Sequence, residues 1–519
     1  MIDGCFFHLL FELNSCSENK ENFTLGVVIR QSSISTVFTY IGVAIGFINV
    51  LWLFPAYLST EQIGLIRILP SAAFLILPIA QLGLSQSLVK FYPDLKDKKS
   101  GVAQLIGLLI LGIIAGLIIF SVAFILFHES ISEMFLVKSK LILDYIHVIV
   151  CLVVIFSFQL LFEVYTRTLF KIVIPNLIKE VLIRVMTSIA VTLHFLEFIT
   201  FDQLANGLII IYLIALIVLL AYIKYLNALK ISFQFNIIDK VLLKKIANYS
   251  LFALMGSGGT YVLLNIDQIM ITSMLGLSEN GIYTTAFYIA VVIEMVRRPI
   301  SQISQPLISN SFKQNDIAAI EKIYKQVSIN QMIIGGLLYI GIVSNLDNLY
   351  ALMPNSESFQ IGKWVMIIVG AGKLIDMTFG INGEVIIMSN FYRFNVVTVI
   401  ILALITILFN YLLIPIYGMT GAAIATLLSM IIYNLIKMIF IKVKLKIIPF
   451  TWNNLIMLGI IMLILALGVY FPKIENTILD ILIRSSIITF SFGTIVYLLK
   501  VSQEVNELTR KAFGIFKKD

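Results

Sequence analysis

The chain has 519 residues, of which 59% are hydrophobic and only 13% are charged, and its mean hydropathy is +0.99. Soluble globular proteins carry roughly 25% charged residues, so this composition excludes a soluble protein and indicates a membrane protein. The net charge of +8 would suggest nucleic acid as a partner of a soluble protein, but membrane topology can place the basic residues here, so no nucleic acid partner is expected.

Residues 1–33 are predicted to be an N-terminal cytoplasmic extension. The stretch "MIDGCFFHLLFELNSCSENKENFT" lacks the basic start and the long apolar core of a signal peptide, and "LGVVIRQSS" reads like a natural beginning. Three cysteines, Cys5, Cys16 and Cys151, show no metal-binding or redox spacing. We therefore expect no disulfide framework, no metal site and no cofactor.

The chain contains about fourteen apolar runs long enough to cross a bilayer, whose core of about 30 Å requires roughly 20 helical residues. The first set is expected at residues 34–56, 63–88, 102–127, 142–164, 173–195 and 203–223. After a lysine-rich interval, further spans are expected at residues 247–274, 281–306, 327–348, 363–388, 394–415, 419–441, 454–471 and 478–499. The sequence therefore predicts an all-α, polytopic membrane protein.

The distribution of basic residues supports this division of the chain. Most of the 37 Lys and Arg fall in the tails and the even-numbered loops when the N-terminus is placed in the cytoplasm, as the positive-inside rule requires. Examples are "KFYPDLKDKK" (90–99) and "KVKLK" (442–446). A missed or invented span would disturb this alternation. Both termini are therefore expected in the cytoplasm, with short external loops.

The two sets of six spans look duplicated. "LSTEQIGL" (58–65) precedes the second span and "LSENGIYT" (277–284) precedes the eighth, while "PIAQ" (78–81) and "PISQ" (299–302) follow later in the same spans. Both sets start on the same side, so they would be parallel repeats. The predicted domains are an N-lobe at 34–223, a cytoplasmic linker at 224–246, a C-lobe at 247–441, and two spans with a cytoplasmic tail at 442–519.

The pattern "IDQIMITSMLGLSENGIYTTAFYIA" (266–290) is similar to the flippases of the polysaccharide biosynthesis family, the Wzx-type O-antigen exporters, and "TYIGVAIGFINVLWLFPAYLSTEQIGL" (39–65) matches comparably. The resemblance covers about residues 26–500. It implies a MATE-like fold, with two six-helix lobes around a central cavity and two additional C-terminal helices. It also implies that undecaprenyl-pyrophosphate-linked oligosaccharides are flipped to the outer leaflet of a bacterial inner membrane. The expected partners are this substrate, membrane lipids, H⁺ or Na⁺ as a coupling ion, and a polysaccharide polymerase.

A diphosphate needs cationic partners to cross hydrocarbon, so arginines within the spans are the first candidate ligands. Arg184 lies near the centre of its span, and Glu180 precedes it at i,i+4 spacing. One interpretation is a self-neutralising pair that holds helices together. The other makes Arg184 a bidentate phosphate or sugar ligand whose rotamer Glu180 sets.

The stretch "EMVRRPISQISQPLI" adds Glu294, Arg297 and Arg298 near the inner mouth. Both arginines could extend to the cytoplasmic headgroups, or Glu294 and Arg298 could pair at i,i+4 and line the side facing the substrate. Arg67 and Arg484 lie within two turns of the outer surface, where extension to the headgroups is expected. Arg184, Arg298, Arg297 and Arg67 form the set of candidate substrate ligands.

The buried acids are candidates for coupling or for structural pairing. Asp267 lies about five turns into its span, and either an inter-lobe hydrogen bond or a proton or cation site would explain it. Lys373 and Asp376, at i,i+3, are expected to pair. Glu384 is a further buried acid. The set of buried or coupling acids is Asp267, Glu180, Glu294, Asp376 and Glu384.

Other functions share parts of this pattern. A MATE-type drug or cation antiporter would have the same topology, but we would expect acids to dominate its cavity, and the span at 34–56 carries no charge. A membrane polymerase or glycosyltransferase usually holds its catalytic groups in a large extramembrane loop, and no outer loop here is long enough, so no enzyme is expected. A lipid II flippase is a near alternative within the same superfamily.

Overall fold

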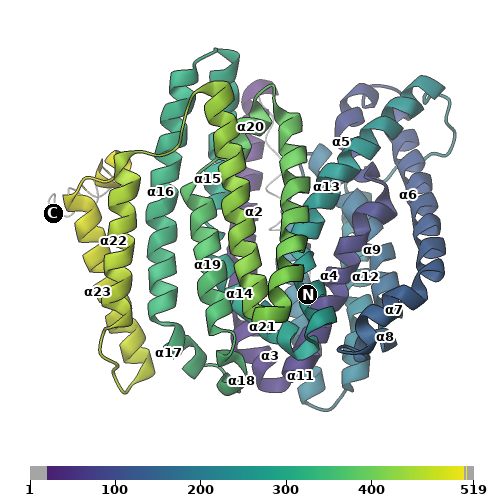
Figure 1. Ribbon diagram of the computed structural model, residues 1–519. Coiled ribbons are helices and arrows are strands. Elements are labelled where there is room, and N and C mark those ends of the chain that lie inside the picture. Colours follow the sequence, from purple (N-terminus) through teal and green to yellow (C-terminus); the bar gives the residue numbers. More distant parts are fainter. Residues whose placement is uncertain (1–19, 508–509, 511–519) are drawn as a thin grey trace, which may run out of the picture.

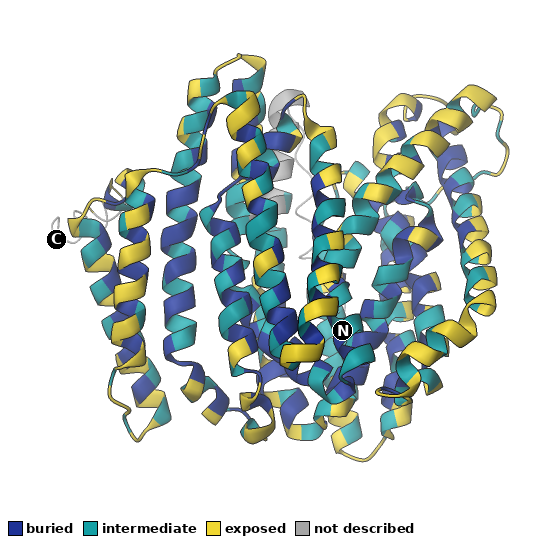
Figure 2. Cartoon of the chain, in the orientation of Figure 1, coloured by how far each residue is buried: buried dark blue, intermediate teal, exposed yellow. Residues whose placement is uncertain are grey.

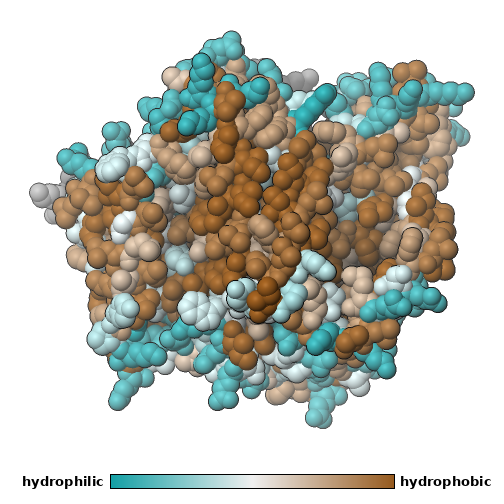
Figure 3. All heavy atoms as spheres, in the orientation of Figure 1, coloured by the Kyte–Doolittle hydropathy of each residue, from teal (hydrophilic) through white to brown (hydrophobic). Residues whose placement is uncertain are grey.

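The computed structural model describes residues 20–507 and residue 510, and within these residues all regular structure is helical. Figure 1 shows long helices lying side by side, and Figure 3 shows a broad hydrophobic band between two hydrophilic ends. The end that carries the exposed lysines at Lys96–Lys99 is called the basic end here. The end that carries the short helices α17 (Leu346–Ala351) and α18 (Ser356–Gln360) is called the opposite end.

The first half of the chain begins with a crossing made of three consecutive helical pieces. They are α2 (Lys20–Ile48), η2 (Asn49–Leu53) and α3 (Phe54–Tyr57), and the five-residue η2 is a π-helical turn. The following elements are α4 (Thr60–Gln81), α5 (Leu84–Leu95), α6 (Gly101–Leu126), α7 (His128–Leu136), α8 (Leu141–Asp144), α9 (Ile146–Thr168), α10 (Val173–Leu177), η3 (Ile178–Leu182), α11 (Ile183–Phe195) and α12 (Phe201–Tyr225).

The second half of the chain is also entirely helical in its regular structure. Its elements are α13 (Lys240–Met274), α14 (Leu277–Glu294), α15 (Arg297–Lys313), α16 (Ile317–Ser344), α17, α18, α19 (Lys363–Thr378), α20 (Asn382–Met388) and α21 (Tyr392–Leu445), followed by α22 (Trp452–Val469) and α23 (Thr477–Leu498). The non-helical segment between α12 and α13 packs on the start of α6, because Ser232 N–H donates to the carbonyl of Ala103 at 3.0 Å.

Local sequence explains where several helices begin. Ser59 and Thr200 are N-caps of capping boxes, in which the hydroxyl oxygen accepts from the backbone N–H of Gln62 or Gln203 and the glutamine side chain accepts from the cap's own N–H. Asp239 caps α13 by accepting from Leu242 N–H. These polar caps stabilise helix starts that lie outside the hydrophobic band.

Nine helices of the described chain are long and apolar enough to cross a membrane, or up to ten if the bent pair α19–α20 is one span. One of the nine, α21, has 54 residues, which would extend about 80 Å if straight, more than twice the thickness of a bilayer core. Gly418 (φ 59°, ψ −142°) breaks it into two crossings. The remaining predicted spans correspond to α13, to α14 with α15, and to α10–η3–α11, which are more polar or broken.

Five spans that the sequence predicts as continuous helices are interrupted, and two of these, at 142–164 and 327–348, break at the single residues Tyr145 and Asn345. The span at 63–88 breaks at Leu82 and Gly83, both in the left-handed region, and a Cβ on Gly83 would lie 2.2 Å from the carbonyl oxygen of Ser250. The span at 281–306 breaks between α14 and α15. The span at 363–388 bends by 45° between α19 and α20, where Gly380 has φ 66°. Left-handed residues lie at the breaks near Leu82 and Gly380, and hydropathy alone does not reveal any of these breaks.

The two halves are in closest contact near the opposite end, where α4 crosses α14. A Cβ on Gly64 would lie 1.9 Å from the carbonyl oxygen of Leu277, and a Cβ on Gly281 would lie 2.0 Å from that of Thr60. Thr60 Oγ1 and Ser278 Oγ are 2.7 Å apart, within hydrogen-bond distance. Glycine is therefore required on both helices for this approach.

Helix faces turned toward other helices are largely buried, and faces turned outward are largely exposed (Figure 2). One large cluster joins the first half to α14 and α19, a second packs α16 and α19 against α22 and α23, and a third lies among α15, α16, α20 and α21. Exposed apolar residues such as Ile118 and Ile125 of α6 suit a surface in contact with lipid.

Candidate functional site

A cavity of about 490 Å³ lies between α4, α9, η3–α11 and α12 of the first half and α13 and α14 of the second half. Its size falls within the range of roughly 300–1,000 Å³ typical of small-molecule sites. Four lining residues are cationic (Arg67, Arg167, Lys179 and Arg184) and one is acidic (Glu163). Excess positive charge inside such a cavity favours an anionic ligand.

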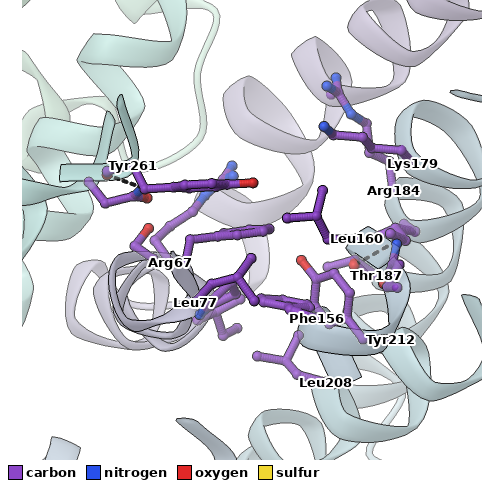
Figure 4. Close-up of a pocket in the computed structure, with 18 of the residues that line it drawn as sticks. Arg67, Leu77, Phe156, Leu160, Lys179, Arg184, Thr187, Leu208, Tyr212 and Tyr261 are labelled. Atoms are coloured by element: carbon purple, nitrogen blue, oxygen red, sulfur yellow. Dashed lines mark hydrogen bonds between the residues drawn. The ribbon is translucent and has the colours of Figure 1, made fainter. Parts of the chain in front are cut away.

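Figure 4 shows how the labelled residues lie around this cavity. Lys179 and Arg184 lie on the right in this view, Arg67 and Tyr261 lie on the left, and the rings of Phe156 and Tyr212 lie below. The groups come from several different helical elements of both halves, so a shift of one half relative to the other changes the shape of the cavity.

Arg184 is held by three groups. Its guanidinium donates to Glu180 Oε2 at 2.8 Å, to the carbonyl oxygen of Gly42 at 2.5 Å and to the hydroxyl of Tyr288 at 2.8 Å. The predicted i,i+4 pair with Glu180 is therefore present. A Cβ on Gly46 would lie 2.3 Å from Arg184 Nη1 and 2.0 Å from Tyr288 Oη, so only glycine admits this arrangement.

Arg67 lies over two aromatic rings and has no acidic side chain in ion-pair distance within the described chain. Its guanidinium carbon is 5.3 Å from the centre of the Phe54 ring and 6.0 Å from that of Tyr288, distances at which cation–π attraction operates. We expected this side chain to extend to the headgroups, but it lines the cavity instead. In this position Phe54 and Tyr288 offer it aromatic partners in the interior.

Several lining residues were not among the candidates from the sequence. Glu163 and Arg167 lie one turn apart on α9, and this i,i+4 spacing is visible in the sequence. They lie near the end of a predicted span, where charged residues are common, so they were not chosen as candidates. Tyr261 and Tyr288 are ordinary aromatic residues in the sequence and enter the cavity only through the packing of α13 and α14. Lys179 lies one residue before Glu180 and lines the cavity with Arg184.

A second polar group of residues lies within the second half of the chain. Arg297 donates to Asp376 Oδ2 at 2.7 Å and lies 3.7 Å from Glu294 Oε1, while Lys373 lies 2.6 Å from Glu294 Oε2. The expected Lys373–Asp376 pair is therefore wrong, because each residue finds its partner on the α14–α15 segment rather than on its own helix. Arg297 does not line the 490 Å³ cavity. The side chain of Arg298, also a candidate ligand, lies outside the described residues.

This network extends further into the interior. Asp376 Oδ1 accepts from Asn434 at 2.9 Å, Ser301 donates to Glu384, and Lys437 donates to the hydroxyl of Tyr433. Lys437 is only 3% exposed and lies 3.9 Å from the ring centre of Tyr433. The burial of Lys437 could not be predicted from the sequence, because a lysine near the end of an apolar run resembles an interfacial residue.

Asp267 is buried and accepts three hydrogen bonds. The donors are the hydroxyl of Tyr283 at 2.9 Å, the amide of Asn410 at 2.6 Å and the hydroxyl of Thr426 at 2.7 Å. All three donors belong to the same half of the chain as Asp267, on α14 and α21. The alternative of an inter-lobe hydrogen bond is therefore wrong, since the packing of α13 against α21 supplies nearer donors.

Arg484 also differs from its expected position. It is 4% exposed and donates to Asp480 Oδ2 at 2.8 Å and to the carbonyl oxygen of Gly468 at 2.7 Å. The expected extension to the headgroups is wrong for this residue, because Asp480 neutralises it one turn away. The pair fastens α23 to the end of α22.

Comparison with known proteins gives the family. The model of the polysaccharide biosynthesis protein family matches residues 28–312, more than half of the chain. The chain belongs to this family. The resemblance that the sequence patterns suggested is thus confirmed.

Two relatives of this protein are distant from it in sequence. The chain is 23% identical over 257 residues to the probable low-salt glycan biosynthesis flippase Agl15 of Haloferax volcanii, a match that covers 46% of this chain and 54% of the relative. It is 27% identical over 169 residues to the capsular polysaccharide biosynthesis protein CapF of Staphylococcus aureus, covering 32% of this chain and 41% of the relative. The matches thus span about half of these relatives' length.

Similarity to solved structures shows the fold of this protein. The lipid II flippase MurJ in an inward closed conformation aligns with a TM-score of 0.69 at 15% identity, covering 90% of this chain and 99% of MurJ. An inward-facing multidrug MATE transporter of the MOP superfamily aligns with a TM-score of 0.55 at 12% identity, covering 81% and 98%. The predicted all-α, MATE-like polytopic fold is confirmed, and the chain is a multi-pass membrane protein.

Proposed function

We propose that this protein flips a lipid-linked oligosaccharide across a membrane by alternating access, with the pyrophosphate bound in the 490 Å³ cavity. The observation that carries the proposal is the convergence of Arg67 and Arg184 on Tyr288 inside a cavity within the hydrophobic band. Glu180 neutralises Arg184, and no acid neutralises Arg67 in the described chain. A cavity with this charge has a net attraction for a diphosphate.

The finer features of the proposal follow from the family and the charge pattern. The substrate is an undecaprenyl-pyrophosphate-linked unit of an O-antigen, capsule or exopolysaccharide. The basic end faces the cytoplasm of a bacterial inner membrane, in accordance with the positive-inside rule. Asp267 is the candidate site for a coupling H⁺ or Na⁺, and a polysaccharide polymerase is the candidate partner at the opposite face.

The same cavity argues against two rival functions. A MATE-type antiporter for organic cations requires acids facing its substrate, whereas here four cationic residues and one acid line the cavity. A polymerase or glycosyltransferase requires a catalytic group beside its lipid substrate at the membrane surface. The long buried helices here instead suit a transporter.

The test is complementation of surface polysaccharide in a strain that lacks the gene. Arg184→Ala should abolish surface polysaccharide at normal protein abundance, and lipid-linked precursor should accumulate on the cytoplasmic face. Arg184→Lys should also lose most activity, because lysine can neutralise Glu180 but lacks the planar fork that holds two phosphate oxygens. Full rescue by Arg184→Lys and Arg67→Lys would refute the phosphate-ligand role. Precursor that accumulates on the outer face would favour a polymerase.

A further inference from the structure

The wall of the cavity formed by α9 has a chemistry different from that of the arginines. Phe156, Gln159 and Glu163 all line the cavity, and their spacing of three and four residues places them on one face of α9. Phe74 of α4 and Tyr261 of α13 stand beside them. These five residues are called the carboxylate wall below.

Buried polar atoms of the carboxylate wall lack good partners. Gln159 is 7% exposed and Glu163 is 9% exposed, yet the hydrogen bond between them is long, at 3.4 Å. Gln159 Oε1 is buried and has no hydrogen-bond partner among the residues that the structure describes. The ion pair of Glu163 with Arg167 is loose, at 3.9 Å, and Arg167 is 57% exposed. A buried amide oxygen without a hydrogen-bond partner lowers the stability of the fold. Gln159 and Glu163 can therefore accept hydrogen bonds from a bound ligand.

Aromatic rings frame these acceptors. Phe74 stacks on Phe156 with ring centres 4.3 Å apart, and the ring of Tyr261 is parallel to that of Phe74 with centres 6.1 Å apart. Figure 4 shows the Tyr261 and Phe156 rings on the cavity surface, away from Lys179 and Arg184. Apolar faces beside strong acceptors are what a sugar ring requires.

A phosphate does not suit the carboxylate wall, because the charge of Glu163 would repel it. A sugar is neutral, its hydroxyl groups donate to carboxylate and amide oxygens, and its C–H faces pack on aromatic rings. We propose that the carboxylate wall is the glycan subsite of the cavity, where Glu163 and Gln159 accept hydrogen bonds from a sugar next to the pyrophosphate and Tyr261 packs on its apolar face. This inference rests on the proposed function and assigns residues that select the substrate by its sugar.

The test uses the purified full-length protein in detergent and five probes. One probe is farnesyl pyrophosphate, and the other four carry glucose, galactose or their 2-acetamido forms on the terminal phosphate. The wild type should bind at least one sugar-bearing probe about 10-fold more tightly than farnesyl pyrophosphate, the ratio expected for one or two charge-assisted hydrogen bonds.

The variants separate sugar recognition from phosphate binding. Glu163→Gln and Gln159→Met should both bring this ratio close to one. Gln159→Met leaves the charge of the cavity unchanged and should keep the affinity for farnesyl pyrophosphate within about twofold. Glu163→Gln removes a charge that repels phosphate, so it should not weaken the binding of farnesyl pyrophosphate. Tyr261→Phe should keep the ratio, and Tyr261→Leu should lower it, because the ring face and not the hydroxyl packs on the sugar. Glu129→Gln, at an exposed position of α7, is the matched control and should change neither affinity. Thermal unfolding checks that each variant is folded.

The outcomes distinguish this inference from the proposed function. If every probe binds equally, or if Glu163→Gln and Gln159→Met leave the sugar preference unchanged, the glycan subsite is refuted while pyrophosphate binding stands. If Arg184→Ala leaves the affinity for farnesyl pyrophosphate unchanged, or if no probe binds the wild type, the phosphate site is refuted and the glycan subsite with it. A preference that falls only in the carboxylate-wall variants supports the inference.

Discussion

Tyr288 is the residue through which the two halves of the chain share the cavity. It belongs to α14, yet its hydroxyl accepts from Arg184 of the first half and its ring lies near Arg67 of the first half. A diphosphate that binds both guanidinium groups would compete with Tyr288 for them. Substrate binding would therefore weaken one of the links between the halves, which is a direct way to couple occupancy to movement.

Gly46→Ala should impair transport without changing the amount of protein in the membrane. The added Cβ would lie 2.0 Å from Tyr288 Oη and 2.3 Å from Arg184 Nη1, so both groups must move and the Arg184–Tyr288 hydrogen bond is lost. We expect a loss of about 10-fold or more in transport rate, as for removal of one charged hydrogen bond. The measurement is flipping of labelled lipid-linked substrate in proteoliposomes.

Gly207→Ala is the matched control for this change, because a Cβ there has no atom within 4 Å. It should leave the rate unaltered. Equal rates for the two alanine variants would show that the position of Arg184 does not matter for transport.

Asp267→Asn tests the coupling role of the buried acid. Asn410 Oδ1 has no hydrogen-bond partner in the described part of the chain. A flip of the Asn410 amide therefore lets this oxygen accept from the amide group that the substitution introduces, while the remaining oxygen at position 267 accepts from Tyr283 and Thr426. The fold should therefore survive, whereas a bound proton or cation would be lost. We expect slower transport with a flatter dependence on pH or on Na⁺. Activity equal to that of the wild type under all these conditions would leave Asp267 a structural role only.

Pairs on one helix could be predicted from the sequence, and pairs between helices could not. Glu180 and Arg184 pair as their i,i+4 spacing indicates. Lys373 and Asp376 have comparable spacing, yet they pair with Glu294 and Arg297 because α19 packs against the α14–α15 segment. Tyr288 lies within the pattern at 266–290, but nothing in that pattern marks it as a cavity residue, so only the packing of the helices reveals its part in the site.

At the scale of the elements, the order of the apolar runs along the chain could be predicted, because bilayer thickness fixes the length of such a run. Breaks within the spans could not be predicted, as the interruption between α4 and α5 shows. Leu82 takes a left-handed conformation there, and Gly83 lies against the backbone of Ser250 on α13. A helix partner that is far away in the sequence imposes this break, so hydropathy, which averages over neighbours in the chain, does not detect it.

The crossing of α4 and α14 should be intolerant of any side chain at its glycines. In Gly281→Ala the Cβ would lie 2.0 Å from the carbonyl oxygen of Thr60, a backbone atom that cannot move without its helix. We expect destabilisation of about 1–3 kcal/mol from this overpacking. Thermal unfolding of the purified protein measures it, with Gly341→Ala as control because its Cβ would meet no atom within 4 Å. Identical unfolding temperatures for the two variants would show that the helices separate freely.

At the scale of the whole molecule, the orientation in the membrane can be tested with single cysteines in a background from which Cys5, Cys16 and Cys151 have been removed. A cysteine at Asn476, an exposed position away from the basic end, should react with an impermeant thiol reagent in intact cells. A cysteine at Ser100, at the basic end, should react only after the cells are permeabilised. Labelling at Ser100 in intact cells would invert the orientation.

A covalent link between the two halves tests alternating access itself. Thr60 Oγ1 and Ser278 Oγ are 2.7 Å apart where α4 and α14 meet, so Thr60→Cys and Ser278→Cys place two thiols close enough to form a disulfide after small adjustments. If the substrate leaves at the opposite end, α4 and α14 must separate there in every cycle. Oxidation should therefore stop transport in proteoliposomes, and a reductant should restore it. Each single-cysteine variant treated with oxidant serves as a control and should stay active. Transport at the wild-type rate with complete cross-linking would mean that this crossing stays closed throughout the cycle and that the substrate leaves by another route.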